Sequence, residues 1–296
     1  MRTERITCAL GTPARWSGDY LIALIPVYCW GVFAFGAGQT HLQLTCSVLA
    51  SIVFVLAMQL INRHKIVPYH YLIAFVFGMV LGFLMPAGAP MWYAILSAFL
   101  MGTVWYLPRV GIYARKYVHP IAFALSVMGL IFPSFSVGEG SLLISADRTQ
   151  GVYDLLLGRH SGRIGEISIL MILIGGAYLV LRRVIDWQPG VSMLATVALL
   201  SYLFPASGVR TEYMLAQLLT GGTVFASVYL LPICSFRLSG RVKWVYGVLT
   251  GVLTFLFCRF VPNLDGVYPA ILLATAAVRL LDERVTENIR IWQSEF

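Results

Sequence analysis

The stretch HLQLTCSVLASIVFVLAMQLI, residues 41–61, decides the fold class of this chain. It contains no Asp, Glu, Lys or Arg, and Arg63 and Lys65 follow it almost at once. A helix needs about 20 apolar residues to cross the hydrocarbon core of a bilayer. The stretch therefore predicts a transmembrane helix that ends at a basic membrane border.

The same pattern recurs along the chain, which has 296 residues, 59% of them hydrophobic and 11% charged. A soluble domain is about 25% charged, so this composition excludes an ordinary soluble fold. The net charge of +8 lies in short clusters between apolar runs, which argues against a nucleic-acid surface. We expect an all-α polytopic membrane protein with about ten transmembrane helices, at 20–38, 41–61, 69–86, 90–107, 119–136, 164–182, 189–206, 211–233, 242–258 and 264–281.

The basic residues predict the orientation of these spans. With a cytoplasmic N-terminus, sixteen Lys and Arg residues fall on the cytoplasmic side and five on the outer side, as the positive-inside rule requires. A wrong number of spans would scramble this alternation. We therefore expect a multi-pass membrane protein with both termini cytoplasmic: an N-terminal segment 1–19, membrane halves 20–136 and 164–281, an outer loop 137–163, and a C-terminal tail 282–296.

Two short internal matches give different predictions about a repeat. Residues 81–87 (LGFLMPA) resemble residues 200–206 (LSYLFPA), which relates spans three and seven, and these run in the same direction. Residues 76–78 (VFG) resemble residues 224–226 (VFA), which relates spans three and eight, and these run in opposite directions. The second match fits two five-helix halves related as an inverted repeat. We expect that architecture, although the two matches conflict.

The outer loop and the start of the sixth span hold the best candidate binding site. Three glycines allow tight bends or a close approach to a ligand, and they are Gly158, Gly162 and Gly165. A helix N-terminus offers free N–H groups and partial positive charge, and Arg159 and Arg163 add full charges. Glu166, expected in the first helical turn, would complement the helix dipole. These features suit a phosphate or another anion, but a Gly-rich turn with an ordinary helix cap is the simpler explanation.

Other polar residues give weaker signals. Glu166, Glu212 and Asp265 lie at the outer ends of spans, where interfacial exposure and helix capping account for them. His119 precedes Pro120, and we expect it to be packed and to cap a helix, whereas His160 lies in the outer loop. The cysteines form no CxxC pair, so no metal site is expected. Without a relay of buried carboxylates, the chain either passes electrons or neutral species or works with partner subunits.

The run Gly158–Ser168 carries a family resemblance, together with the pair Gly175-Gly176 and the run Arg182–Trp187. It resembles the Gly-Ser-Ile-Gly-Glu-x-Ser motif of the D subunit of the Rnf electron-transport complex and of its relative, the B subunit of the sodium-pumping NADH:quinone reductase. Further motifs, such as Asp265-Gly266-Val267, follow in the family's order. The resemblance implies a subunit of an oxidoreductase and translocase complex in the bacterial plasma (inner) membrane, which carries electrons through a flavin, is coupled to Na⁺ or H⁺ transport, and packs against other membrane subunits.

The resemblance also implies a cofactor. Family members usually carry a covalent flavin mononucleotide (FMN) on the last residue of a Ser-Gly-Ala-Thr-like motif in the outer loop. The matching region here reads Ser145-Ala146-Asp147-Arg148-Thr149-Gln150-Gly151, so Thr149 is the nearest candidate for attachment, and a second, non-covalent flavin stays open. The missing motif keeps two alternatives open: a flavin-less scaffold paralogue, and a small-solute channel or transporter.

Overall fold

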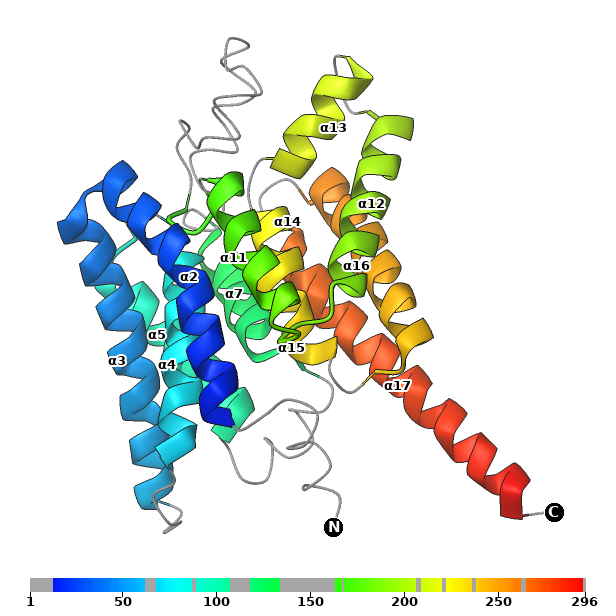
Figure 1. The fold of residues 1–296 in the computed structure, drawn as a ribbon, viewed down its shortest axis with the longest axis horizontal. Coiled ribbons are helices and arrows are strands. Elements are labelled where there is room, and N and C mark those ends of the chain that lie inside the picture. Colours follow the sequence, from blue (N-terminus) through cyan, green and yellow to red (C-terminus); the bar gives the residue numbers. More distant parts are fainter. Residues whose placement is uncertain are drawn as a thin grey trace.

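The computed structural model describes residues 13–61, 68–86, 89–106, 118–133, 163–166, 168–205, 209–219, 222–235, 238–261 and 265–294. Every regular element in these ranges is a helix (Figure 1). In chain order the helices are α2 (Pro13–Phe35), α3 (Ala37–Ile61), α4 (Pro68–Phe83), α5 (Met91–Tyr106), α7 (Pro120–Ile131), α11 (Ile169–Leu181), α12 (Gln188–Leu203), α13 (Arg210–Leu219), α14 (Gly222–Phe225), the π-helix η1 (Ala226–Leu230), α15 (Leu231–Ser235), α16 (Gly240–Phe260) and α17 (Val267–Ser294).

The lengths and compositions of these helices confirm a polytopic all-α membrane protein. Among the described residues, 3 helices are long and apolar enough to cross a membrane: Arg15–Phe35, Thr40–Ile61 and Gly240–Phe260. If the bent pair Arg210–Leu219 and Gly222–Ile233 is counted as one span, the number of helices that could cross a membrane rises to 4. Shorter apolar helices of 10–17 residues occupy the other expected spans. A helix lies in each of the ten expected ranges, and the number of true crossings stays a prediction.

Two expected spans differ from the observed helices. The sixth was expected from residue 164, but α11 begins at Ile169, and residues 164–166 form a turn before it. The eighth was expected as one helix over 211–233, but it is broken into α13, α14, η1 and α15, with a bend of 55°. The expected bounds followed the apolar residues alone, although Gly165 and the pair Gly221-Gly222 lie at the two breaks, and glycine is a common signal for a break in a helix.

With α13–α15 counted as one span, the described helices divide into two groups of five whose main packing contacts are similar. In the first group, α3 packs on α4 and α5, and α5 packs on α7. In the second, α12 packs on α13, η1, α15 and α16, and α16 packs on α17. Contacts of α2 with α11 and of α7 with α17 join the groups. Figure 1 shows α2 and α11 running in opposite directions, as do α3 and α12. This arrangement supports the inverted repeat.

The same kind of side-chain hydrogen bond occurs within helices of both groups. In each of four helices, a Ser or Thr hydroxyl donates to the carbonyl oxygen four residues earlier: Ser51 to Ser47 in α3 (2.8 Å), Thr196 to Ser192 in α12 (2.7 Å), Ser97 to Tyr93 in α5 (2.7 Å) and Thr250 to Tyr246 in α16 (2.7 Å). If α3 corresponds to α12 and α5 to α16, then α4 would correspond to the broken span α13–α15, which is the pairing that the match of residues 76–78 with 224–226 predicts; the inverted repeat stays a prediction. The match that relates α4 to α12 does not fit this packing.

Aromatic side chains fill the core where the two groups meet. Tyr20 of α2 and Tyr229 of η1 are fully buried, with ring centroids 6.4 Å apart. The Tyr229 hydroxyl donates to the carbonyl oxygen of Ala23 at 2.8 Å, which ties η1 to α2. The Phe225 ring contacts both the Tyr229 ring and the Phe83 ring of α4. The broken span is therefore held between α2 and α4.

Candidate functional site

The candidate site begins at the turn of residues 163–166, just before α11. The N–H of Glu166 donates to the carbonyl oxygen of Arg163 at 3.0 Å, and the N–H of Gly165 donates to the carbonyl oxygen of Phe83 at 2.8 Å. Gly165 lies directly on Phe83: a Cβ there would be 2.8 Å from the Phe83 Cβ and 3.0 Å from its carbonyl oxygen. Glycine is needed here because the turn is packed against the end of α4.

Glu166 does not play the expected helix-dipole role. Helix α11 begins three residues later, its N-cap is Ser168, and its first turn contains no acidic residue. The Glu166 carboxylate instead accepts hydrogen bonds from Arg163 Nη1 at 3.2 Å and from the Tyr268 hydroxyl at 2.9 Å. The hydrogen bond between Glu166 and Tyr268 therefore ties the turn to α17, and Glu166 is not part of α11.

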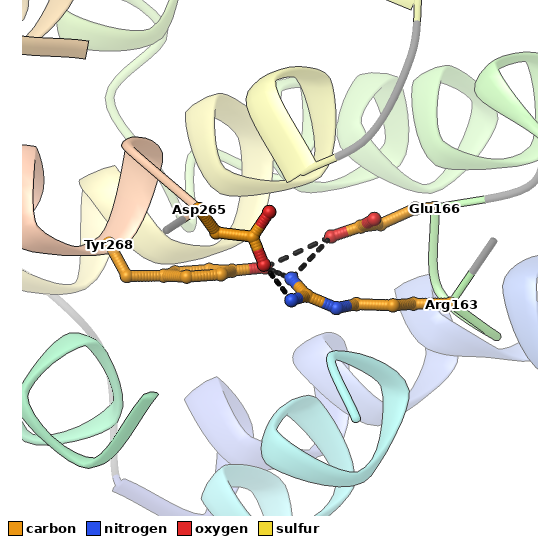
Figure 2. Close-up of polar contacts among 4 residues, drawn as sticks. All are labelled: Arg163, Glu166, Asp265 and Tyr268. Atoms are coloured by element: carbon orange, nitrogen blue, oxygen red, sulfur yellow. Dashed lines mark hydrogen bonds and ion pairs between the residues drawn. The ribbon is translucent and has the colours of Figure 1, made fainter. Parts of the chain in front are cut away.

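Four side chains form a buried ion cluster at this place, drawn in Figure 2: Arg163, Glu166, Asp265 and Tyr268. Arg163 Nη1 also donates to the Tyr268 hydroxyl at 2.6 Å, and Arg163 Nη2 pairs with the Asp265 carboxylate. Arg163, Glu166 and Tyr268 are 4%, 6% and 2% exposed. The guanidinium lies 5.2 Å from the centre of the Tyr268 ring. One cation and two carboxylates give the cluster a formal charge of −1 at neutral pH.

The surroundings keep the Arg163 guanidinium charged. Burial by itself lowers the pKa of Arg163, but Tyr268 and Glu166 outweigh burial, so the pKa lies above its usual value. An arginine is in any case protonated at physiological pH. The guanidinium is therefore a fixed positive charge under ordinary conditions.

The cluster connects segments that are far apart in the sequence. Arg163 and Asp265 are 102 residues apart, and Gly222 at the start of α14 lies directly over the cluster. A Cβ on Gly222 would be 2.7 Å from Glu166 Oε1 and 2.8 Å from the Tyr268 hydroxyl. The cluster thus ties the turn of residues 163–166 to the start of α17, and the start of the broken span packs against it.

The structure describes only part of the predicted site. Thr149, Gly158 and Gly162 lie outside the described residues, as does His160. Gly165 and Glu166 lie together in the turn, with their N–H groups bonded within the protein. The expected anion site also included the N-terminus of the sixth span, which is the start of α11. No side chain caps this helix start. The Ser168 hydroxyl beside it is buried without a hydrogen-bond partner among the described residues.

Sequence reasoning placed Glu166 and Asp265 at span ends but missed their partner Tyr268. The signal was available, because Tyr268 is one turn after Asp265, in the motif that opens the tenth span. Sequence reasoning also assigned Asp19 to the cytoplasmic N-terminal segment 1–19. Asp19 lies in α2, is 5% exposed, and accepts hydrogen bonds from Tyr178 at 3.0 Å and from Arg182 at 3.3 Å.

The structure agrees with the expected capping role of His119. Its Nδ1 accepts a hydrogen bond from the N–H of Ala122 at 3.2 Å, which caps α7. Its Nε2 donates to the carbonyl oxygen of Leu230 at 3.0 Å, at the end of η1. The ring is fully buried and neutral in this arrangement, because one nitrogen accepts while the other donates. His119 therefore joins α7 to the broken span.

Comparison with known proteins gives a family. A model of the NQR2, RnfD, RnfE family matches residues 12–290. The B subunit of the Na(+)-translocating NADH-quinone reductase of Pseudomonas aeruginosa (strain LESB58) is 27% identical over 259 residues, covering 78% of this chain and 63% of that protein. The chain thus spans less than two thirds of that relative. The D subunit of the proton-translocating ferredoxin:NAD(+) oxidoreductase complex of Clostridium ljungdahlii is 25% identical over 291 residues, covering 88% of this chain and 87% of that protein.

Proposed function

The chain belongs to the NQR2, RnfD, RnfE family, and on that premise we propose that it is a D-like membrane subunit of an ion-translocating electron-transport complex. The extents of the two alignments favour a D-like subunit over a B-like subunit. The match covers 63% of the Pseudomonas protein but 87% of the Clostridium protein, along most of this chain. In this proposal the chain carries electrons through a flavin and is coupled to Na⁺ or H⁺ transport.

The observation that carries the proposal is the ion cluster at the base of the outer loop. A redox cofactor must be held at a fixed distance from its electron donor and acceptor, so the loop that bears it needs a rigid support. Arg163 and Glu166 supply that support, because they fasten the last residues of the loop to Asp265 and Tyr268. A buried, hydrogen-bonded ion pair resists movement, since breaking it leaves an uncompensated buried charge.

The cofactor of the proposal is FMN, attached through its phosphate to Thr149, with Gly158, Gly162, Gly165 and Glu166 around it. When bound, the flavin supplies the electron transfer, and the protein supplies position and electrostatics. The described residues fit a supporting role better than direct contact. Arg163 is already engaged with two carboxylates, and the N–H of Gly165 is bonded to Phe83. A flavin phosphate would therefore lie in the loop, beyond the turn.

A second candidate function is a scaffold of the same complex that holds no flavin. Two observations favour it: the expected Ser-Gly-Ala-Thr run is Ser145–Gly151 here, and the only guanidinium described at the loop base is committed to protein carboxylates. A small-solute channel or transporter is the third candidate, since two inverted groups of five helices also suit that task.

We further propose other membrane subunits of an Rnf-like complex as partners. The family and the apolar helices indicate a multi-pass protein of a bacterial inner membrane. Both termini are proposed to be cytoplasmic, from the distribution of basic residues. In that orientation the ion cluster and the outer loop lie on the outer face.

The test is flavin fluorescence of the protein band on a denaturing gel, after expression with the native flavin transferase. The proposal predicts a fluorescent band that disappears in Thr149→Ala and persists in Ser145→Ala, the matched control in the same loop. A dark wild-type band with no flavin in an acid extract of the native protein would contradict the electron-carrying role and favour the scaffold. Solute flux into liposomes by the isolated chain would favour the channel.

A further inference from the structure

A basic surface bordered by tryptophans lies at the end of α11 opposite the ion cluster. It joins the connection between α11 and α12 to the start of α16. Lys243 Nζ and Asp186 Oδ2 pair at 2.7 Å, and the rings of Trp187 and Trp244 meet edge to face with centroids 5.7 Å apart. These contacts hold the two segments side by side. We call the group Arg183, Trp187, Arg241 and Trp244 the basic rim.

The basic rim has more positive charge than its neighbours neutralise. Arg182 pairs with Asp19, and Lys243 pairs with Asp186. Arg183 and Arg241 are exposed, and neither forms an ion pair with a residue that the structure describes. Among the described residues, two cations thus have no ion-pair partner, and they lie on the same rim as two indole rings that are 50% and 42% exposed. Cations next to half-exposed tryptophans are typical of a membrane–water interface.

The backbone at Arg183 strengthens the case that its side chain has a task. Helix α11 ends in a Schellman motif: the N–H of Arg183 donates to the carbonyl oxygen of Val180 and the N–H of Val184 to that of Leu179, both at 2.9 Å. Arg183 has a φ of 56°, in the left-handed region where glycine is favoured and a Cβ is disfavoured. An arginine occupies the position where a glycine would fit without strain.

We propose that the basic rim binds the phosphodiester headgroup of an anionic phospholipid. Arg183 and Arg241 would hold the phosphate, and the rings of Trp187 and Trp244 would lie at headgroup level. A lipid fits better than free phosphate because the surface beside the rim is apolar: Leu181 is 83% exposed and Val245 is 57% exposed. The acyl chains of the same molecule cover these side chains, which a free phosphate would leave bare.

The experiment measures tryptophan quenching of the whole protein in phosphatidylcholine bilayers. These contain an equal mole fraction of either brominated phosphatidylglycerol or brominated phosphatidylcholine, and a Trp187→Phe/Trp244→Phe variant gives the background. The wild type is expected to prefer the brominated phosphatidylglycerol. Each of Arg183→Gln and Arg241→Gln is expected to lower that preference about fivefold, which corresponds to ~1 kcal/mol per basic residue near an anionic surface.

The matched control is Arg259→Gln, because Arg259 is exposed at the opposite end of the same helix, α16. It is expected to leave the preference unchanged. An undiminished preference in the Arg183→Gln/Arg241→Gln double variant, or an equal loss in Arg259→Gln, would overturn the proposal. Loss of the wild-type preference on adding inorganic phosphate would assign the site to free phosphate instead, which also overturns it.

Discussion

Replacement of Arg163 by glutamine tests whether the ion cluster holds the loop base. The substitution leaves Glu166 buried without a cation, and breaking a buried pair in this way destabilises by about 3–5 kcal/mol. Glu166→Gln should be milder, about 1–2 kcal/mol, because its amide oxygen still accepts from Tyr268 and Arg163 keeps Asp265. The double variant removes both charges together. Its loss of unfolding free energy should be smaller than the sum of the two single losses by at least ~1 kcal/mol.

The assay is equilibrium unfolding in detergent micelles, followed by fluorescence, with all four proteins in the same detergent. Arg210→Gln is the matched control, because Arg210 is an exposed arginine at the start of α13, and it should change the free energy of unfolding by less than ~0.5 kcal/mol. Additive effects of Arg163→Gln and Glu166→Gln would refute the reasoning, as they would mean that the two side chains do not interact. An effect of Arg163→Gln no larger than that of the control would refute it as well.

Three further substitutions test other contacts by the same unfolding assay. Gly165→Ala should cost about 1–3 kcal/mol, because its Cβ would lie 2.8 Å from the Cβ of Phe83. The control Gly18→Ala should be neutral or slightly stabilising, because a Cβ there meets nothing within 4 Å. Equal effects of the two substitutions would contradict the packing argument. His119→Leu should cost about 2–4 kcal/mol, because it removes the hydrogen bond to the Leu230 carbonyl oxygen and leaves the buried N–H of Ala122 without its cap. His119→Asn should cost less, since an amide still caps α7; the reverse order would count against this role. Arg183→Gly should raise the free energy of unfolding by about 1 kcal/mol in neutral detergent while it weakens the preference for anionic lipid, and a destabilised variant would show that the φ of 56° carries no strain.

Much of the architecture followed from the sequence alone. Apolar runs of nearly 20 residues cannot be kept in water, so they determine a polytopic helical membrane protein, and the basic residues between them predict its orientation. The capping role of His119 was also predictable, because a polar residue before Pro120 is a local signal for the start of a helix. These properties depend on residues that are close together in the chain.

The tertiary structure alone decided which polar groups meet. The sequence shows Arg163, Glu166 and Asp265 near the ends of expected spans, but an ion pair over 102 residues exists only because the turn of residues 163–166 lies against the start of α17, with the start of α14 beside both. The start of α11 was also decided by packing. The N–H of Gly165 bonds to Phe83 of α4, and this contact with another helix keeps residues 164–166 out of α11. A local pattern cannot predict such a contact, because the partner belongs to a distant part of the chain.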